Sequence, residues 1–219
     1  MLEEDLALTN FALDMTGRAE LLLGLAGRLL SPARTADHMA YRRSERQFLN
    51  DLIVELPNND FAFSMMRQFL VSGFEVQLYS ALANSSNEEL AGIAAKTLKE
   101  VRYHFAHATD WVLRMGDGTE ESHRRAQQAL ERLWPYTHEL FEMTDEEKPL
   151  IAAGIAVDNS TLWQAWIEQL ETIVADATLK LPQTNHIQRG GHRGIHTEHL
   201  GHILTELQYL QRAYPDATW

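Results

Sequence analysis

The sequence predicts an all-α protein in which six or seven long helices form a bundle. Hydrophobic residues recur every three or four positions along almost the whole chain of 219 residues, which is the period of a helix and not of a strand. Short clusters of Gly, Pro or Asn interrupt this pattern and mark the ends of the periodic segments. A chain of this length can bury one substantial core, so we expect a single domain over residues 1–219.

The helices follow one another with short connections, and their ends are placed to within about 2–4 residues. The second segment ends at Pro57-Asn58-Asn59-Asp60, where Asp60 suits the N-cap of the third. The first segment is rich in small residues that let a neighbouring helix approach closely: Ala12, Gly17, Ala19, Gly24, Ala26 and Gly27. We expect helices at about 4–30, 37–55, 60–84, 87–115, 120–142, 159–176 and 197–213.

The fourth segment carries the clearest helical pattern. It ends at Gly116-Asp117-Gly118, and Thr119 is a suitable N-cap for the fifth segment. Tight connections of this kind favour antiparallel neighbours in a bundle. One buried face of the fourth helix is predicted from residues spaced three or four apart: Leu90, Ala94, Leu98, Val101, Phe105, Ala108, Val112 and Met115.

The last two helices flank the longest stretch without helical period. Asp158-Asn159-Ser160 opens the sixth helix. Residues 179–195 then form a loop that contains the run Gln188-Arg189-Gly190-Gly191-His192-Arg193-Gly194, and the seventh helix follows it.

Charge and composition exclude several classes of function. Lys and Arg number 19 against 31 Asp and Glu, a formal net charge of −12, which disfavours binding to nucleic acid or to anionic membranes. The absence of cysteine excludes disulfides and thiolate metal sites. The acidic start MLEEDLAL is unlike a signal peptide, and no apolar run reaches the roughly 20 residues that span a bilayer. We therefore expect a cytoplasmic protein.

The residues alone predict neither a metal site nor a catalytic site. A di-iron or di-manganese bundle needs a Glu from each of two helices and a Glu-x-x-His pair from each of two others. The sequence has one such pair, Glu120 and His123, in a first helical turn where an acidic residue also complements the helix dipole. Glu100 and His104 flank the apolar stripe of the fourth helix, and Glu75 lies in an apolar run; these three are the alternative ligands. Motifs of nucleophilic and phosphate-binding enzymes are absent from the sequence.

Six segments carry a resemblance to a known family. They are Asp5-Leu6-Ala7-Leu8-Thr9-Asn10, SERQFLNDLIVELPNNDFA (44–62), KEVRYHFAHATDWVLRMGDGT (99–119), LWPYTHELF (133–141), GIAVD (154–158) and GGHRGIHTEHLGHILTELQYLQRAYPDATW (190–219). Together they resemble the C subunits of bacterial phenylacetyl-CoA epoxidases, over nearly the whole chain. Members of that family usually have a further helix before the position of Asp5, so we expect either a shortened chain or an unusual start.

The resemblance implies a ferritin-like subunit of a multicomponent oxygenase that epoxidises the aromatic ring of phenylacetyl-CoA in phenylacetate catabolism. The expected partners are a catalytic A subunit with a di-iron centre and a reductase with flavin and iron–sulfur groups. This chain is then a structural subunit without a cofactor of its own, which supports the catalytic subunit through a shared apolar surface.

The resemblance also associates two segments with the acyl-CoA substrate. In the first, the amides of Gln47 and Asn50 suit a polar ligand beside the apolar Phe48 and Leu49. The alternative is that Phe48 belongs to the core and that the two amides are caps or solvated groups. The second segment, Lys148-Pro149-Leu150, matches the family less well.

The basic loop is a separate candidate. Arg189, His192 and Arg193 lie among glycines just before a helix N-terminus near His196, which suits an anion such as a CoA phosphate or the acidic face of a partner. A solvated loop is the alternative.

Two other classes of function stay open from the sequence. A self-sufficient di-metal oxidase or oxygenase would use Glu75, Glu100 and His104 with further ligands at unusual spacing, and iron analysis of the purified chain separates it from a structural subunit. A stand-alone helical scaffold would self-associate as a homodimer, and co-purification with the catalytic subunit would argue against it.

Overall fold

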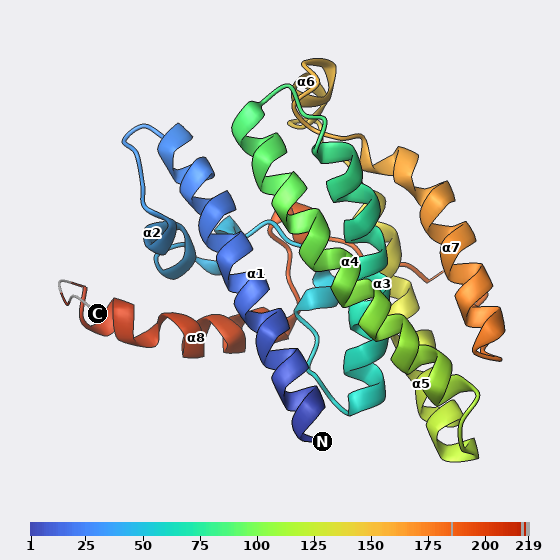
Figure 1. Ribbon diagram of the computed structural model, residues 1–219. Coiled ribbons are helices and arrows are strands. Elements are labelled where there is room, and N and C mark those ends of the chain that lie inside the picture. The colour runs from blue at the N-terminus through green and yellow to red at the C-terminus, as the bar shows by residue number, and fades with distance from the viewer. Residues whose placement is uncertain (185, 216, 218–219) are drawn as a thin grey trace. The chain divides into compact units, whose positions relative to one another are not determined.

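The computed structural model describes residues 1–184, 186–215 and 217. These residues form eight α-helices and five 3-10 helices, with no strand among them (Figure 1). The all-α prediction is therefore confirmed. By their internal contacts, the residues divide into two compact units: unit 1 comprises Met1–Leu49 and Arg193–Trp219, and unit 2 comprises Asn50–His192. A single domain stays a prediction.

Unit 1 is built from both ends of the chain. Its helices are α1 (Leu2–Leu29), α2 (Ala36–Tyr41), the 3-10 helix η1 (Glu45–Gln47) and α8 (Glu198–Ala213). α1 packs against α2, while α8 packs against both α2 and η1. The first and the last predicted helices, 4–30 and 197–213, are confirmed.

The predicted helix at 37–55 is wrong. α2 ends at Tyr41, and two separate 3-10 helices follow, η1 and η2 (Leu52–Val54). The physical reason lies in side chains that bind the backbone. The Gln47 side chain accepts hydrogen bonds from the backbone N–H of Ser44 at 2.8 Å and from its hydroxyl at 3.0 Å. Such local bonds compete with continuation of a helix.

Unit 2 contains four long helices that pack on one another. They are α3 (Phe61–Leu82), α4 (Glu88–Gly116), α5 (Glu120–Leu133) and α7 (Trp163–Asp176). α3 contacts α4, α5 and α7, and α4 contacts α5 and α7 (Figure 1). One fully buried side chain from each helix meets in the core: Phe69, Val112, Leu130 and Trp166. The predicted apolar face of α4 is also confirmed, with Val101, Phe105, Ala108, Val112 and Met115 buried.

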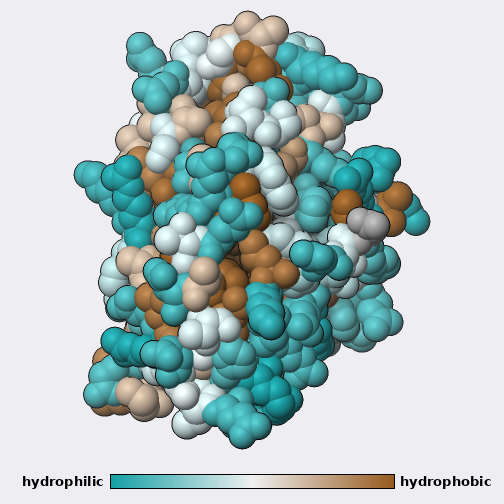
Figure 2. Space-filling view, turned by 90° about the vertical axis from the view of Figure 1, so that its right-hand side faces the viewer, coloured by the Kyte–Doolittle hydropathy of each residue, from teal (hydrophilic) through white to brown (hydrophobic). Residues whose placement is uncertain are grey.

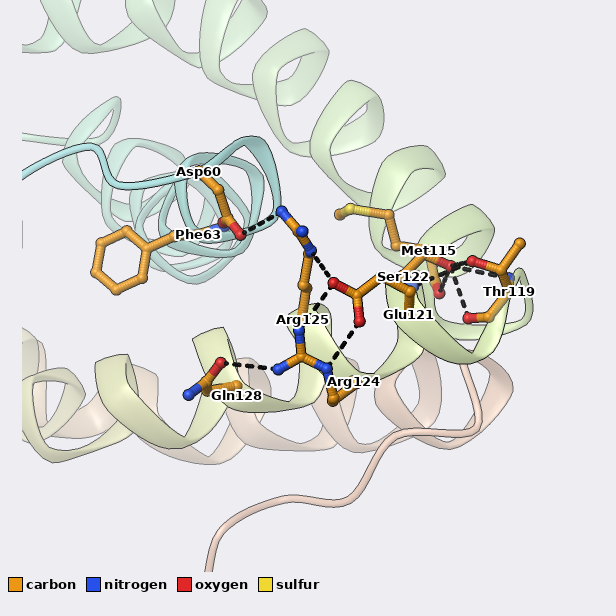
Figure 3. A network of polar contacts seen from close by, with 9 residues as sticks. All are labelled: Asp60, Phe63, Met115, Thr119, Glu121, Ser122, Arg124, Arg125 and Gln128. Carbon is orange, nitrogen blue, oxygen red and sulfur yellow. Dashed lines mark hydrogen bonds and ion pairs between the residues drawn. The ribbon is translucent and has the colours of Figure 1, made fainter.

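The N-termini of α3 and α5 form a polar network at one end of unit 2 (Figure 3). Asp60 caps α3 by accepting from the backbone N–H of Phe63, and Thr119 caps α5, as predicted for both residues. Arg124 and Arg125 both donate to Glu121, which lowers the pKa of the Glu121 carboxyl to about 2. The network connects the two helices because Arg125 also lies 3.4 Å from Asp60.

The predicted helix at 120–142 is correct in its first part only. α5 ends at Leu133, and a 3-10 helix, η3 (Trp134–Phe141), follows it. Pro135 lacks the backbone N–H that an α-helix needs at this position. The structure adds a short α6 (Lys148–Ala152) that the sequence pattern did not predict.

The loop expected at 179–195 is irregular in its described residues, apart from the 3-10 turn η5 (Gly191–Arg193). Before it, the predicted helix at 159–176 begins as a 3-10 turn, η4 (Asn159–Leu162), and continues as α7. Asp158 caps this segment by accepting from the N–H of Ser160, as predicted.

α7 shows how the helices of unit 2 separate apolar from polar faces. It buries Trp166, Leu170 and Val174, whereas Glu168 and Glu171 are exposed. The side of unit 2 that carries α7 faces the viewer in Figure 2, where hydrophilic side chains dominate and hydrophobic ones show between them. None of the helices among the described residues is both long and apolar enough to cross a membrane.

Candidate functional site

The candidate substrate segment at residues 47–49 lies in unit 1 and is partly exposed. Gln47 forms a capping box with Ser44, the N-cap residue of η1. This agrees with the alternative in which the amide of Gln47 is a cap. Phe48 is half-buried beneath the guanidinium of Arg43, whose central carbon lies 4.1 Å from the ring centroid. Leu49 is 66% exposed, so its side chain is available for contact with another molecule. Phe48 is thus only half-buried, whereas the alternative placed it in the core.

A groove of about 640 Å³ lies in the same unit, between η1 and α8. Its lining combines the hydroxyl of Ser44 and the carboxylate of Glu45 with the Tyr209 and Arg212 side chains. Both signs of charge and an aromatic ring therefore meet in it, within a few residues of the candidate segment.

Asn50 belongs to unit 2, where two polar contacts fix its surroundings. Its amide donates to Glu55 Oε1 at 2.8 Å, and Glu55 is 1% exposed. The neighbouring Asp51 Oδ1 lies 2.9 Å from His192 Nε2. This hydrogen bond with Asp51 is the main cause that raises the pKa of His192, with the charges of Asp51 and Glu139 adding to it and burial opposing it. The structure thus brings together two predicted sites, Asn50 and His192, through neighbours that are far apart in sequence.

Glu139 is the most deeply placed carboxylate of this region, with 0% of its surface exposed. Its Oε1 accepts from the backbone N–H groups of Gly190 at 2.7 Å and Gly191 at 2.8 Å, and its Oε2 accepts from the N–H of Leu52 at 2.7 Å. Three backbone donors on one carboxylate compensate for the removal of its charge from water. Glu139 therefore binds the loop and the segment after Asn50 at once.

The basic residues of the loop are largely engaged by carboxylates of the same chain. Arg189 Nε lies 2.6 Å from Glu142 Oε1, and His192 is paired with Asp51. Arg193 is exposed, in unit 1. An external anion at this loop has to compete with these internal carboxylates.

The second candidate substrate segment, 148–150, forms the first turn of α6. Lys148 Nζ lies 2.5 Å from Asp145 Oδ1, and this hydrogen bond raises the pKa of the exposed Lys148. Pro149 occupies the first turn, where its missing N–H costs nothing. Leu150 is 44% exposed. The segment therefore presents one paired cation and one apolar side chain to solvent.

The alternative metal ligands are not gathered into a site. Glu75 is half-buried on α3, and Glu100 pairs with Lys96 at 3.9 Å on α4. His104, which was expected beside the apolar stripe of α4, is 1% exposed and therefore buried. His123 Nδ1 lies 2.8 Å from the carbonyl oxygen of Gly116. Among residues 1–184, 186–215 and 217, no three His, Asp or Glu side chains lie together as metal ligands.

Sequence reasoning missed the two buried carboxylates Glu139 and Glu55. A signal existed for Glu139, since it stands in the apolar run from Leu133 to Phe141, where an acidic residue needs buried partners. The partners themselves could not be read from the sequence, because the backbone donor of Gly190 lies 51 residues away.

Two comparisons with known proteins bear on these residues. The family model described as "Phenylacetic acid catabolic protein" matches residues 1–219. The chain is also 43% identical over 218 residues to the C subunit of 1,2-phenylacetyl-CoA epoxidase from Escherichia coli (strain K12), a match that covers 100% of this chain and 88% of that protein. Both matches include every candidate segment described above.

Proposed function

Because the chain belongs to the phenylacetic acid catabolic protein family, we propose that it is the C subunit of a phenylacetyl-CoA epoxidase in aerobic phenylacetate catabolism. The observation that carries this proposal is the 43% identity to a C subunit over the whole chain. The all-α structure agrees with the ferritin-like fold of the family. In this role the protein works in the cytoplasm, together with a catalytic A subunit and a reductase.

The proposed role is to support the catalytic subunit. Oxygen chemistry then belongs to the di-iron centre of that subunit, and electrons come from the flavin and iron–sulfur groups of the reductase. In the part of the chain that the structure describes, Glu75, Glu100 and His104 are not gathered with further ligands, which supports placing the di-iron centre in the partner. Its most buried carboxylates, Glu139 and Glu55, instead bind backbone N–H groups and an amide of the same chain.

The proposal extends to contact with the acyl-CoA. In unit 1, exposed Leu49 and half-buried Phe48 offer an apolar surface. In unit 2, half-buried Asn50 carries a side-chain amide that also donates to Glu55. Leu150 provides a second exposed apolar side chain beside Lys148. Pockets for such ligands combine a mostly apolar lining with a few polar groups that fix orientation.

Co-expression tests the supporting role. The catalytic subunit is expressed with and without this chain, and both the amount of soluble catalytic subunit and the epoxidation of phenylacetyl-CoA with reductase present are measured. We expect both quantities to fall strongly without this chain, because the catalytic subunit then exposes the surface that the partner covers. Equal activity without this chain would contradict the role.

Analysis of the chain purified alone separates the other functions. About two irons per chain with oxygenase activity would favour a self-sufficient di-metal enzyme. A homodimer that fails to bind the catalytic subunit would favour a stand-alone scaffold, and light scattering of the mixture measures this directly.

A further inference from the structure

One buried carboxylate joins two segments of unit 2 that each contain a candidate site residue. Leu52, two positions after Asn50, donates its backbone N–H to Glu139 Oε2 at 2.7 Å. Gly190 and Gly191, just before His192, donate theirs to Glu139 Oε1 at 2.7 and 2.8 Å. Each oxygen of the carboxylate therefore holds one of the two segments.

The backbones of the two segments are also in direct contact. A Cβ atom added to Gly191 would lie 1.8 Å from the carbonyl oxygen of Asn50, so no larger residue fits there without moving one segment. Gly190 has a φ of 148°, in a region that favours glycine. The hydrogen bond between Asp51 and His192 adds a side-chain contact between the same two segments.

The chemistry of the contact requires a carboxylate. Both oxygens of an ionised Glu accept hydrogen bonds and neither donates, which matches three converging N–H groups. A glutamine of the same shape keeps one acceptor oxygen but turns an NH₂ group toward N–H donors. It therefore releases either Leu52 or the pair Gly190 and Gly191, and it leaves buried donors without an acceptor.

We propose that Glu139 is a positioning residue for acyl-CoA binding, which holds the segment 50–52 against the loop 190–192 and so keeps Asn50 and His192 at a fixed separation. Glu139 is fully buried, so it acts through these residues and does not itself touch the substrate. This inference rests on the proposed function.

The test compares the variant Glu139→Gln with the control variant Glu131→Gln. Glu131 is an exposed carboxylate on the neighbouring α5. Hydrogen–deuterium exchange is measured on the purified chain, and kcat and KM for phenylacetyl-CoA on the assembled epoxidase. We expect faster exchange at the amides of Leu52, Gly190 and Gly191, with the buried amides of α4 unchanged. We expect KM to rise about tenfold, because binding must then order the two loosened segments, while kcat changes less than about twofold.

Gly191→Ala provides a second route to the same change, because its Cβ pushes the loop away from Asn50 while Glu139 stays intact. It should raise KM in the same direction, and it carries the test if Glu139→Gln fails to fold. Glu131→Gln should match the wild type in both measurements.

Each outcome decides the proposal. Wild-type exchange in Glu139→Gln would overturn the positioning role, and faster exchange with an unchanged KM would overturn its link to acyl-CoA. In both cases an active wild-type complex shows that the proposed function itself holds. A wild-type complex without epoxidation would overturn the proposed function together with this inference.

Discussion

Single residues of the basic loop are paired with carboxylates of the chain itself. Glu139 accepts hydrogen bonds from the backbone N–H groups of Gly190 and Gly191. Arg189 is paired with Glu142, and His192 is paired with Asp51. Groups that would suit a phosphate therefore serve first to fix the loop. An anion that binds Arg189 or His192 has to displace an internal carboxylate, which weakens its binding, whereas Arg193 is exposed.

The pairing of His192 with Asp51 predicts a pH dependence of stability. A histidine whose pKa is raised in the folded state contributes stability in full below its unfolded pKa of about 6.5, and this contribution disappears as pH rises through the folded pKa. We expect the free energy of unfolding to fall as pH rises from about 6.5 through the folded pKa of His192. The variant His192→Asn should lack the part of this fall that His192 causes. Urea unfolding across this pH range measures it. A wild-type slope in His192→Asn would refute the assignment.

Long helices were predictable because their signals are local and repeated. The stripe of α4 and the caps Asp60 and Thr119 can all be read within a few residues. The errors at 37–55 and 120–142 arose where one local feature outweighs the period, namely the cap formed by Gln47 and the missing N–H of Pro135. At the candidate site, the family resemblance pointed to Asn50 and the basic, glycine-rich run pointed to His192, but the contacts that join their segments span up to 141 residues and leave no local trace.

The cap of α5 gives a prediction at the scale of an element. Thr119 accepts from the N–H of Ser122 at 3.2 Å, and we expect Thr119→Ala to lower the free energy of unfolding by about 1 kcal/mol. Thr172→Ala on α7 is the matched control, because that exposed hydroxyl donates to the carbonyl of Glu168 within the helix and caps nothing. Chemical denaturation compares the two. Equal stability of the two variants would show that the cap contributes little.

At the scale of the whole molecule, the two units differ in how the chain builds them. Unit 2 is one continuous stretch, whereas unit 1 combines residues 1–49 with residues 193–219. α8 joins the two parts of unit 1, since the amide of the buried Gln208 donates to the carbonyl oxygens of Ala40 and Arg43, both at 3.0 Å. The stability of α2 and η1 therefore depends on residues near the opposite end of the sequence.

Gln208→Leu tests this dependence. The change removes the Gln208 donor from both carbonyl oxygens, although Arg212 still donates to that of Arg43 at 3.0 Å. We expect a loss of about 1–3 kcal/mol from the stability of unit 1. Hydrogen exchange should become faster in residues 36–47 and stay unchanged in α4. Gln128→Leu, an exposed glutamine on α5, is the control of the same chemical type. Unchanged protection of residues 36–47 in Gln208→Leu would contradict the coupling.

The discontinuous make-up of unit 1 has a consequence for biosynthesis. Domains generally fold as units while the ribosome is still translating. All residues of unit 2 leave the ribosome before α8 does. Until α8 emerges, the surfaces of α2 and η1 that contact it stay uncovered. A premature stop codon ahead of α8 therefore deprives helices near the start of the polypeptide of their packing partner.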